Sequence, residues 1–135
     1  MVKLIVGLKG SGKTKALIEM VNAKVNETPG SVVCLEKGGK LIHEINYQAR
    51  LIDTDEYKIG SADALYGFLA GIYASNHDLT DLFIDSALKI CNNQIDTFEQ
   101  FVSSVKAFAE DKSLNVVMTV SCAPEELSDS VRAMI

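Results

Sequence analysis

Residues 7–14 read G-L-K-G-S-G-K-T and contain the residue types that hold a chain of phosphates. The segment matches the pattern G-x-x-x-x-G-K-[ST], in which glycines let the backbone wrap closely around phosphate oxygens. Lys13 would contact the β- and γ-phosphates of a nucleoside triphosphate, and the Thr14 hydroxyl would bind the Mg²⁺ that bridges them. The spacing therefore predicts a nucleotide-binding segment, here named the glycine-rich loop.

The elements on either side of the glycine-rich loop suit this chemistry. The apolar run at 2–6 predicts a strand that leads into the loop, and a periodic apolar face predicts a helix from about Lys13 to Asn26. The amino end of that helix would place a positive dipole end beside the phosphates. The residues expected to bind the nucleotide are Gly7, Leu8, Lys9, Gly10, Ser11, Gly12, Lys13 and Thr14.

A second signal lies at residues 81–85, an apolar segment that ends in Asp85. Together the two segments resemble the Walker A and Walker B motifs of the P-loop NTPases, and the layout is most similar to the branch with RecA-like and thymidine-kinase-like proteins. The resemblance implies a P-loop fold with ATP and Mg²⁺ as ligands. It also implies that Thr14 and Asp85 bind the metal and that Lys13 and Asp85 are the catalytic residues.

The residue after Asp85 departs from the family pattern. RecA-like proteins normally carry a glutamate there, which polarises the attacking water, whereas this chain has Ser86. We therefore expect an ATPase that hydrolyses slowly or only when a partner stimulates it. No N-K-x-D segment for guanine recognition is present, so ATP is favoured over GTP.

Two further functions stay open at this stage. In a small-molecule phosphotransferase, an acid such as Asp55 would act as the base, and Arg50 or Arg132 would clamp the phosphoryl group. Glu56 is a second candidate for the base. A non-catalytic nucleotide-sensing or partner-binding module needs no glutamate after Asp85, so Ser86 is compatible with that function too. Whether the chain is an enzyme is thus undecided by its sequence.

The remaining patterns alternate between strands and helices. Apolar runs predict strands at 32–35, 81–85 and 116–120, and periodic patterns predict helices at 61–75, from about 96 and from 124. Ser61 is expected to cap the first of these helices, and Gly67 and Gly71 on one face would let its backbone approach a neighbour closely. Asp96 and Glu99 are expected to form a capping box at the start of the second. Residues 41–52 fit a strand or hairpin slightly better than a helix. The alternation predicts an α/β fold, a three-layer sandwich with a mostly parallel central sheet.

In such a sheet the carboxyl ends of the strands meet at one edge. This places the glycine-rich loop, Asp85 and residues 119–121 together. Thr119 or Ser121 then either resembles the polar sensor of RecA-like proteins or only satisfies nearby backbone groups. Residues 36–40 follow a strand at the same edge, and their lysines either contact phosphate or form a solvated turn.

Length and composition narrow the class of protein. The 135 residues predict a single domain, 1–135, and a net charge of −5 disfavours nucleic acid as a partner. Three widely spaced cysteines favour free thiols and a cytoplasmic location. The longest uncharged apolar stretch, 64–74, is shorter than the roughly 20 residues that cross a bilayer, so no membrane association is expected. A protein partner and a homo-oligomer both remain open.

Overall fold

The computed structural model describes residues 1–135 and contains a five-stranded sheet in which all neighbouring strands are parallel. The strands lie in the order β1-β5-β4-β2-β3. Their bounds are β1 Val2–Gly7, β2 Ser31–Glu36, β3 Arg50–Asp53, β4 Leu79–Ile84 and β5 Asn115–Ser121. The helices are α1 Lys13–Glu27, α2 Ala62–Ser75, α3 Ala87–Ile90, α4 Ile95–Lys112 and α5 Asp129–Arg132. The predicted α/β alternation with a parallel sheet is confirmed.

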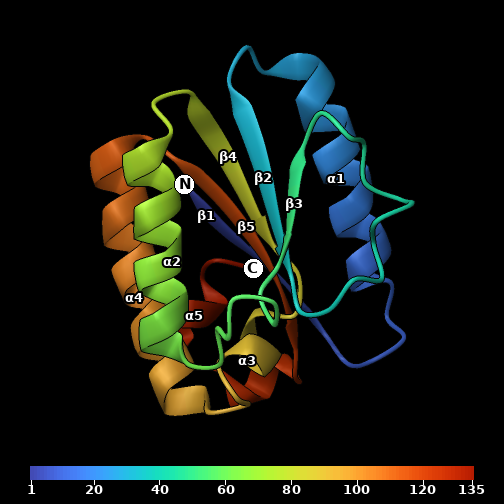
Figure 1. Cartoon of the computed structure of the whole chain (residues 1–135). Coiled ribbons are helices and arrows are strands. Elements are labelled where there is room, and N and C mark those ends of the chain that lie inside the picture. The colour runs from blue at the N-terminus through green and yellow to red at the C-terminus, as the bar shows by residue number, and fades with distance from the viewer.

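The helices cover both faces of the sheet. Figure 1 shows α1 on one face, with α2 and α4 on the other. Along β4, Leu82 and Ile84 belong to the core cluster on the α2–α4 side, and Phe83 between them belongs to the cluster on the α1 side. This alternation follows from the pleat of a strand, which points successive side chains to opposite faces. The expected three-layer arrangement is therefore confirmed.

The carboxyl ends of the strands lie side by side at one edge of the sheet. Gly7 at the end of β1 pairs with Ser121 at the end of β5, and Glu36 at the end of β2 pairs with Asp53. Asp85 follows the last residue of β4, and its N–H donates to the carbonyl oxygen of Leu35 at 2.8 Å. Polar residues from separate parts of the sequence are thus gathered at this edge.

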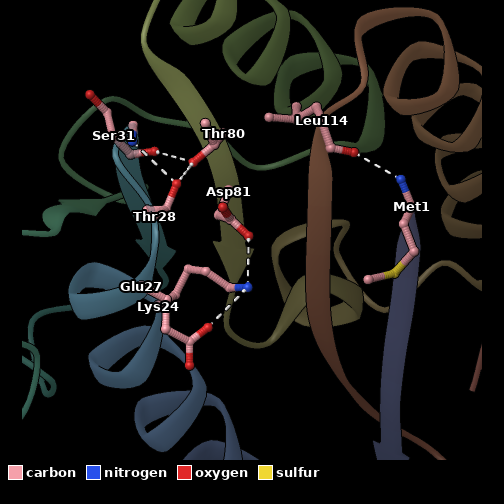
Figure 2. A network of polar contacts seen from close by, with 9 residues as sticks. Met1, Lys24, Glu27, Thr28, Ser31, Thr80, Asp81 and Leu114 are labelled. Atoms are coloured by element: carbon pink, nitrogen blue, oxygen red, sulfur yellow. Dashed lines mark hydrogen bonds and ion pairs between the residues drawn. The ribbon is translucent and has the colours of Figure 1, made fainter.

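The amino ends of the strands are tied together by a different set of polar contacts, which Figure 2 shows. The hydroxyls of Thr28 and Thr80 lie 2.9 Å apart, and Nζ of Lys24 lies 3.9 Å from Oδ2 of the buried Asp81. These contacts join the end of α1 to β4. The polar groups at the amino edge of the sheet therefore stabilise the fold. Those at the carboxyl edge are the ones available to a ligand.

The segment between β2 and β3 differs from the prediction. A strand or hairpin at 41–52 is correct only for Arg50–Asp53, and the residues before it form turns and bends. Because β2 and β3 are parallel, the chain must return from the carboxyl edge to the amino edge before β3 can begin. The side chain of Asn22 on α1 holds this crossover, since it donates to the carbonyl of Glu44 at 2.9 Å and accepts from the N–H of Asn46 at 2.8 Å.

The start of α4 also differs from the prediction. A capping box formed by Asp96 and Glu99 is wrong, because α4 begins after Gln94 without a side-chain cap. Glu99 instead accepts a hydrogen bond from the N–H of Ser128 at 2.6 Å. The tertiary contact with the carboxyl-terminal segment therefore takes the place of the local one.

The segment from Pro124 to the end of the chain is divided into two short elements. A 3₁₀ turn spans Pro124–Glu126 and α5 follows it, where the pattern predicted one continuous helix. The Glu126 side chain accepts from the N–H of Ala123 at 2.8 Å, and Ser128 then caps α5. Each side chain satisfies the backbone locally, so the turn closes before a longer helix can form.

Helix α2 lies on the surface with one face in the core. Ser61 caps it as predicted, accepting from the N–H of Ala64 at 3.1 Å. Gly67 and Gly71 are exposed, and a Cβ at either would meet nothing within 4 Å, so the expectation that they bring a neighbouring backbone close is wrong. None of the helices combines the length and apolar character needed to cross a membrane.

Candidate functional site

The glycine-rich loop connects the end of β1 to the first turn of α1. Gly10 and Gly12 have φ angles of 85° and 87°, in the left-handed region that residues with a Cβ rarely adopt. A Cβ at Gly7 would lie 2.5 Å from Oγ of Ser11, so the Ser11 side chain would have to move to make room for it. The backbone conformations at Gly10 and Gly12 therefore fix the path of the loop, and Gly7 allows the Ser11 side chain to lie close to the backbone.

Helix α1 begins without a side-chain cap, because Gly12 stands at its N-cap position. The N–H groups of its first turn remain free to bind an anion. Nζ of Lys13 lies 3.1 Å from the carbonyl oxygen of Leu8, and only 8% of Lys13 is exposed. The ammonium group is thus held over the glycine-rich loop, where a phosphate oxygen can replace the carbonyl as its partner.

Thr14 and Asp85 meet at the start of α1. The Thr14 hydroxyl donates to Oδ1 of Asp85 at 3.1 Å, and Asp85 is buried. In an octahedral Mg²⁺ shell with metal–oxygen distances of about 2.1 Å, neighbouring ligand oxygens lie about 3 Å apart. The two side chains have the oxygen chemistry and the separation that two ligands of one Mg²⁺ require.

The structure has no group of three or more His, Cys, Asp and Glu side chains placed to hold a metal ion. Mg²⁺ usually takes only one or two protein ligands and completes its shell with phosphate oxygens and water. A site formed by Thr14 and Asp85 alone is therefore suited to an ion that arrives with a phosphate ligand.

Strand β5 lies between β1 and β4 and brings Thr119 against Asp85. The Thr119 hydroxyl donates to Oδ1 of Asp85 at 2.7 Å and accepts from the N–H of Ser86 at 2.7 Å. Ser121, two residues further along, is exposed and lines the cavity described below. The two residues considered from the sequence thus differ: Thr119 positions a carboxylate, and Ser121 faces the open site.

Ser86 adopts a left-handed backbone conformation, with φ 61° and ψ 46°. This conformation costs a residue with a side chain roughly 1–2 kcal/mol, and the hydrogen bond from the Ser86 N–H to Thr119 holds it in place. The bend turns the chain from β4 into α3, an element that the sequence patterns did not predict. As a result Ser86, which precedes α3, and Lys89, which lies on α3, both line the cavity.

A cavity of about 640 Å³ lies at the carboxyl edge of the sheet around these residues. From the glycine-rich loop, its lining includes Lys9, Gly10, Gly12, Lys13 and Thr14, whereas Gly7, Leu8 and Ser11 lie outside. Six of the thirteen Lys and Arg residues of the chain line it, namely Lys9, Lys13, Lys15, Lys37, Lys40 and Lys89. Positive charge is therefore concentrated in one place on a chain with a net charge of −5, which favours a polyanionic ligand.

Glu36 is a cavity residue whose role was not predicted from the sequence, and Lys15, Leu41 and Lys89 also line the cavity without having been predicted. It ends β2, is 2% exposed, and accepts hydrogen bonds from the N–H groups of Lys40 and Leu41. Burial raises the pKa of Glu36, and the charges of Asp85 and Asp53 act in the same direction, while the backbone donors oppose them. An acid directly after an apolar strand was the available signal, the same one that identified Asp85.

The other charged residues considered for catalysis do not reach the cavity. Asp55 forms an ion pair at 2.7 Å with Lys37, which lines the cavity, but Asp55 itself does not line it, and Glu56 is exposed. Arg50 lines a different cavity near the amino end of β3, and Arg132 pairs with Asp129 next to it on α5. None of the four residues considered for a phosphotransferase thus lines the cavity at the glycine-rich loop.

No protein-family model matches the chain, and no curated protein is significantly similar to it. Any function must be argued from the residues and the geometry described above.

Proposed function

We propose that this chain binds a nucleoside triphosphate, with ATP favoured, together with Mg²⁺, and that it hydrolyses the nucleotide slowly or with the help of a partner. The proposal rests on the resemblance of the glycine-rich loop and of the segment ending in Asp85 to P-loop NTPases. One observation supports it above the others. Thr14 and Asp85, 71 residues apart in the sequence, lie in hydrogen-bond contact at the edge of a lysine-rich cavity.

Each residue has a distinct part in this proposal. The glycine-rich loop and the free N–H groups of α1 hold the phosphate chain, and Lys13 moves its ammonium group from the Leu8 carbonyl to the phosphates. Thr14 and Asp85 hold the metal, with Thr119 fixing the carboxylate. Bound Mg²⁺ neutralises charge on the phosphates and orients them for attack.

The proposed site has no side chain that is free to activate the attacking water as a general base. Ser86 cannot act as a general base, and the buried Glu36 carboxylate is engaged by the N–H groups of Lys40 and Leu41. A positioned base contributes roughly 10²- to 10⁴-fold to such a reaction. We therefore expect turnover by the isolated chain below about 1 per second, the lower end of typical enzyme rates.

A turnover assay tests the proposal directly. The purified chain is incubated with Mg-ATP, with and without cell extract, and both free phosphate and phosphorylated small molecules are measured, with Lys13→Ala as the background. Slow phosphate release that depends on Lys13 supports the proposal. A labelled small molecule would favour the phosphotransferase instead, and binding without any turnover would favour the sensing module. No binding of ATP at all would refute all three.

A further inference from the structure

A second cavity lies between α2 and α4 and shares no residue with the cavity at the glycine-rich loop. Its volume is about 400 Å³, at the lower end of the range of roughly 300–1,000 Å³ that is usual for small-molecule sites. It is lined by the start of α2, the residues that join α3 to α4, and α4 itself. Figure 1 shows the starts of α2 and α4 beside α3, at the edge of the sheet where the strands end. We name this space the helix cavity.

The helix cavity has a buried apolar floor. Ala62, Cys91 and Phe101 line it and belong to the core cluster on the α2–α4 side of the sheet. The half-buried ring of Tyr66 also lines it, and this ring meets the ring of Phe108 edge to face, with centroids 6.1 Å apart. The contact with Phe108 holds the Tyr66 ring in place, so the floor offers a fixed apolar surface to the hydrocarbon part of a ligand.

The rim of the helix cavity is polar and almost free of charge. Asp63 is the single charged residue among the twelve that line it, whereas eight of the fourteen residues around the first cavity are charged. No lysine, arginine or histidine is present to pair with a phosphate or carboxylate group. The helix cavity is therefore suited to an uncharged ligand, in contrast to the cavity at the glycine-rich loop.

The hydrogen-bonding groups of the rim are largely unused within the protein. Of its side chains, only two form hydrogen bonds there: Ser61 accepts from the N–H of Ala64, and Thr97 donates to the carbonyl of Gln94. The others are exposed, namely Asp63, Asn92, Gln94, Gln100 and Ser104. A carboxamide offers both donors and an acceptor, and a carboxylate offers acceptors alone. A hydroxyl group on carbon donates and accepts at once, so it matches this mixture better than a group that only donates or only accepts.

The walls of the helix cavity are fixed before a ligand binds. Ser61 caps α2 at 3.1 Å, and the hydrogen bond from Thr97 to the Gln94 carbonyl, at 3.2 Å, closes the first turn of α4. Between α3 and α4, Asn92 and Asn93 turn the chain with φ angles of 60° and 55°, a conformation that asparagine tolerates better than most residues. A preorganised wall loses little entropy when it binds a ligand.

We propose that the helix cavity binds an uncharged ring with several hydroxyl groups, of the size of a monosaccharide or a cyclic polyol. The C–H face of the ring packs on Tyr66 and Phe101, and its hydroxyls bind the carboxamides of Gln94 and Gln100 and the carboxylate of Asp63. The apolar floor and the uncharged donors and acceptors together account for both halves of such a ligand. This inference does not depend on nucleotide binding.

The test is a titration of the nucleotide-free protein, followed by the amide signals of its ¹H–¹⁵N NMR spectrum. The probes are D-glucose and myo-inositol. We expect saturable shifts at the residues that line the helix cavity, with a Kd in the millimolar range that is usual for so small a ligand. Gluconate and glucose 6-phosphate, which add a negative charge, should bind at least tenfold more weakly. They are scored at the same amides, because their charge also attracts them to the lysines of the other cavity.

The double variant Gln94→Leu/Gln100→Leu should weaken binding of the neutral probes tenfold or more. Both positions are exposed and neither side chain bonds within the protein, so the fold is kept, and urea unfolding checks this. The matched control is Gln48→Leu, the same change at an exposed position outside the helix cavity, which should alter the affinity less than twofold.

Three results would overturn the proposal. The first is no saturable shift at the lining residues with either neutral probe, and the second is binding of the anionic analogues there as tight as that of glucose. The third is an equal loss in the double variant and in Gln48→Leu. All these measurements omit nucleotide, so their failure leaves the proposed function of the glycine-rich loop intact.

Discussion

The hydroxyl of Thr119 on β5 donates to Oδ1 of Asp85 at 2.7 Å and at the same time accepts from the N–H of Ser86. One buried side chain thus fixes both the carboxylate at the end of β4 and the bend that follows it. Thr119 has 1% of its surface exposed, so it acts on a ligand only through Asp85.

Thr119→Val is expected to lower the free energy of unfolding by about 1–3 kcal/mol, because it removes a buried hydroxyl that donates to Asp85 and accepts from the partly buried N–H of Ser86. It should also weaken the Mg²⁺ dependence of nucleotide binding, since Asp85 loses its orientation. Thr119→Ser keeps the hydroxyl and serves as the matched control. Urea unfolding and calorimetry measure both effects, and equal Mg²⁺ dependence in the two variants would contradict a positioning role.

Lys13→Ala is expected to lower the affinity for Mg-ATP roughly ten- to a hundredfold while the protein remains folded. The change removes a charge-assisted contact to phosphate, worth about 1.5–3 kcal/mol, and little core volume. Calorimetry on the folded variant measures the loss. Lys106→Ala, an exposed lysine of α4, is the control. An unchanged affinity would mean that the glycine-rich loop does not bind nucleotide.

Asp85→Asn is expected to weaken nucleotide binding in the presence of Mg²⁺ more than binding in EDTA. The amide oxygen can still accept from Thr119 and Thr14, so the fold is kept, but a neutral oxygen is a poorer ligand for a hard cation. The ratio of affinities with and without Mg²⁺ measures the effect. Equal losses under both conditions would remove Asp85 from the metal site.

The variant Glu36→Gln tests how burial of the Glu36 carboxylate changes the free energy of unfolding with pH. Its pKa in the folded protein lies above the ordinary value of 4.5, chiefly because of burial, so the folded state binds more protons than the unfolded state between these two pKa values. The contribution of Glu36 to stability is therefore greatest at low pH and is lost as the pH rises through the folded pKa.

The glutamine variant keeps an oxygen that can accept from Lys40 and Leu41, but it has no charge to desolvate. Relative to wild type, Glu36→Gln should gain stability as the pH is raised from about 4.5 to neutral. Urea unfolding of both proteins at several pH values gives the difference. If the wild type instead gained stability relative to the variant as the pH rises, the pKa of Glu36 would not be raised in the folded protein, and this prediction would be wrong.

The three cysteines are expected to be unreactive in the folded protein. All are buried, and burial raises the pKa of Cys34 and of Cys91 to about 12 and raises that of Cys122. Since the thiolate is the reactive form, a thiol reagent at pH 8 should label almost nothing until the protein is unfolded. Cys122 should react first, because it directly follows Ser121, which lines the open cavity. Earlier labelling of Cys34 would argue against this order.

Local patterns in the sequence were enough for the elements that carry the strongest signals. The strand before Gly7, the helix from Lys13 and the capping of α2 by Ser61 depend on neighbouring residues, and the structure confirms them. The parallel sheet follows from their alternation. The meeting of Thr14 with Asp85 could be anticipated from the carboxyl-edge rule for such sheets.

Other features depend on contacts that no local pattern contains. The path of residues 41–49 is set by Asn22 on a distant helix, and Glu99 is occupied by Ser128 instead of its own helix. Glu36 follows an apolar run as Asp85 does, but its burial depends on the next turn, which folds over the end of β2. Asp55 also follows a strand, but it pairs with Lys37 and does not itself line the cavity.

The link from Asn22 to the crossover after β2 has a consequence for the cooperativity of the fold. The segment has no helix of its own. It is held by the Asn22 side chain at its middle, by Glu36 at its start, and by three side chains buried in the core cluster that includes Leu17 of α1, namely Leu41, Ile45 and Ala49. Its backbone therefore opens to solvent together with α1 as one unit of local unfolding. Amide hydrogens of Leu41 and Asn46 should exchange at rates that follow the opening of that helix, so anything that stabilises α1 also slows exchange in a loop on the other side of the cavity.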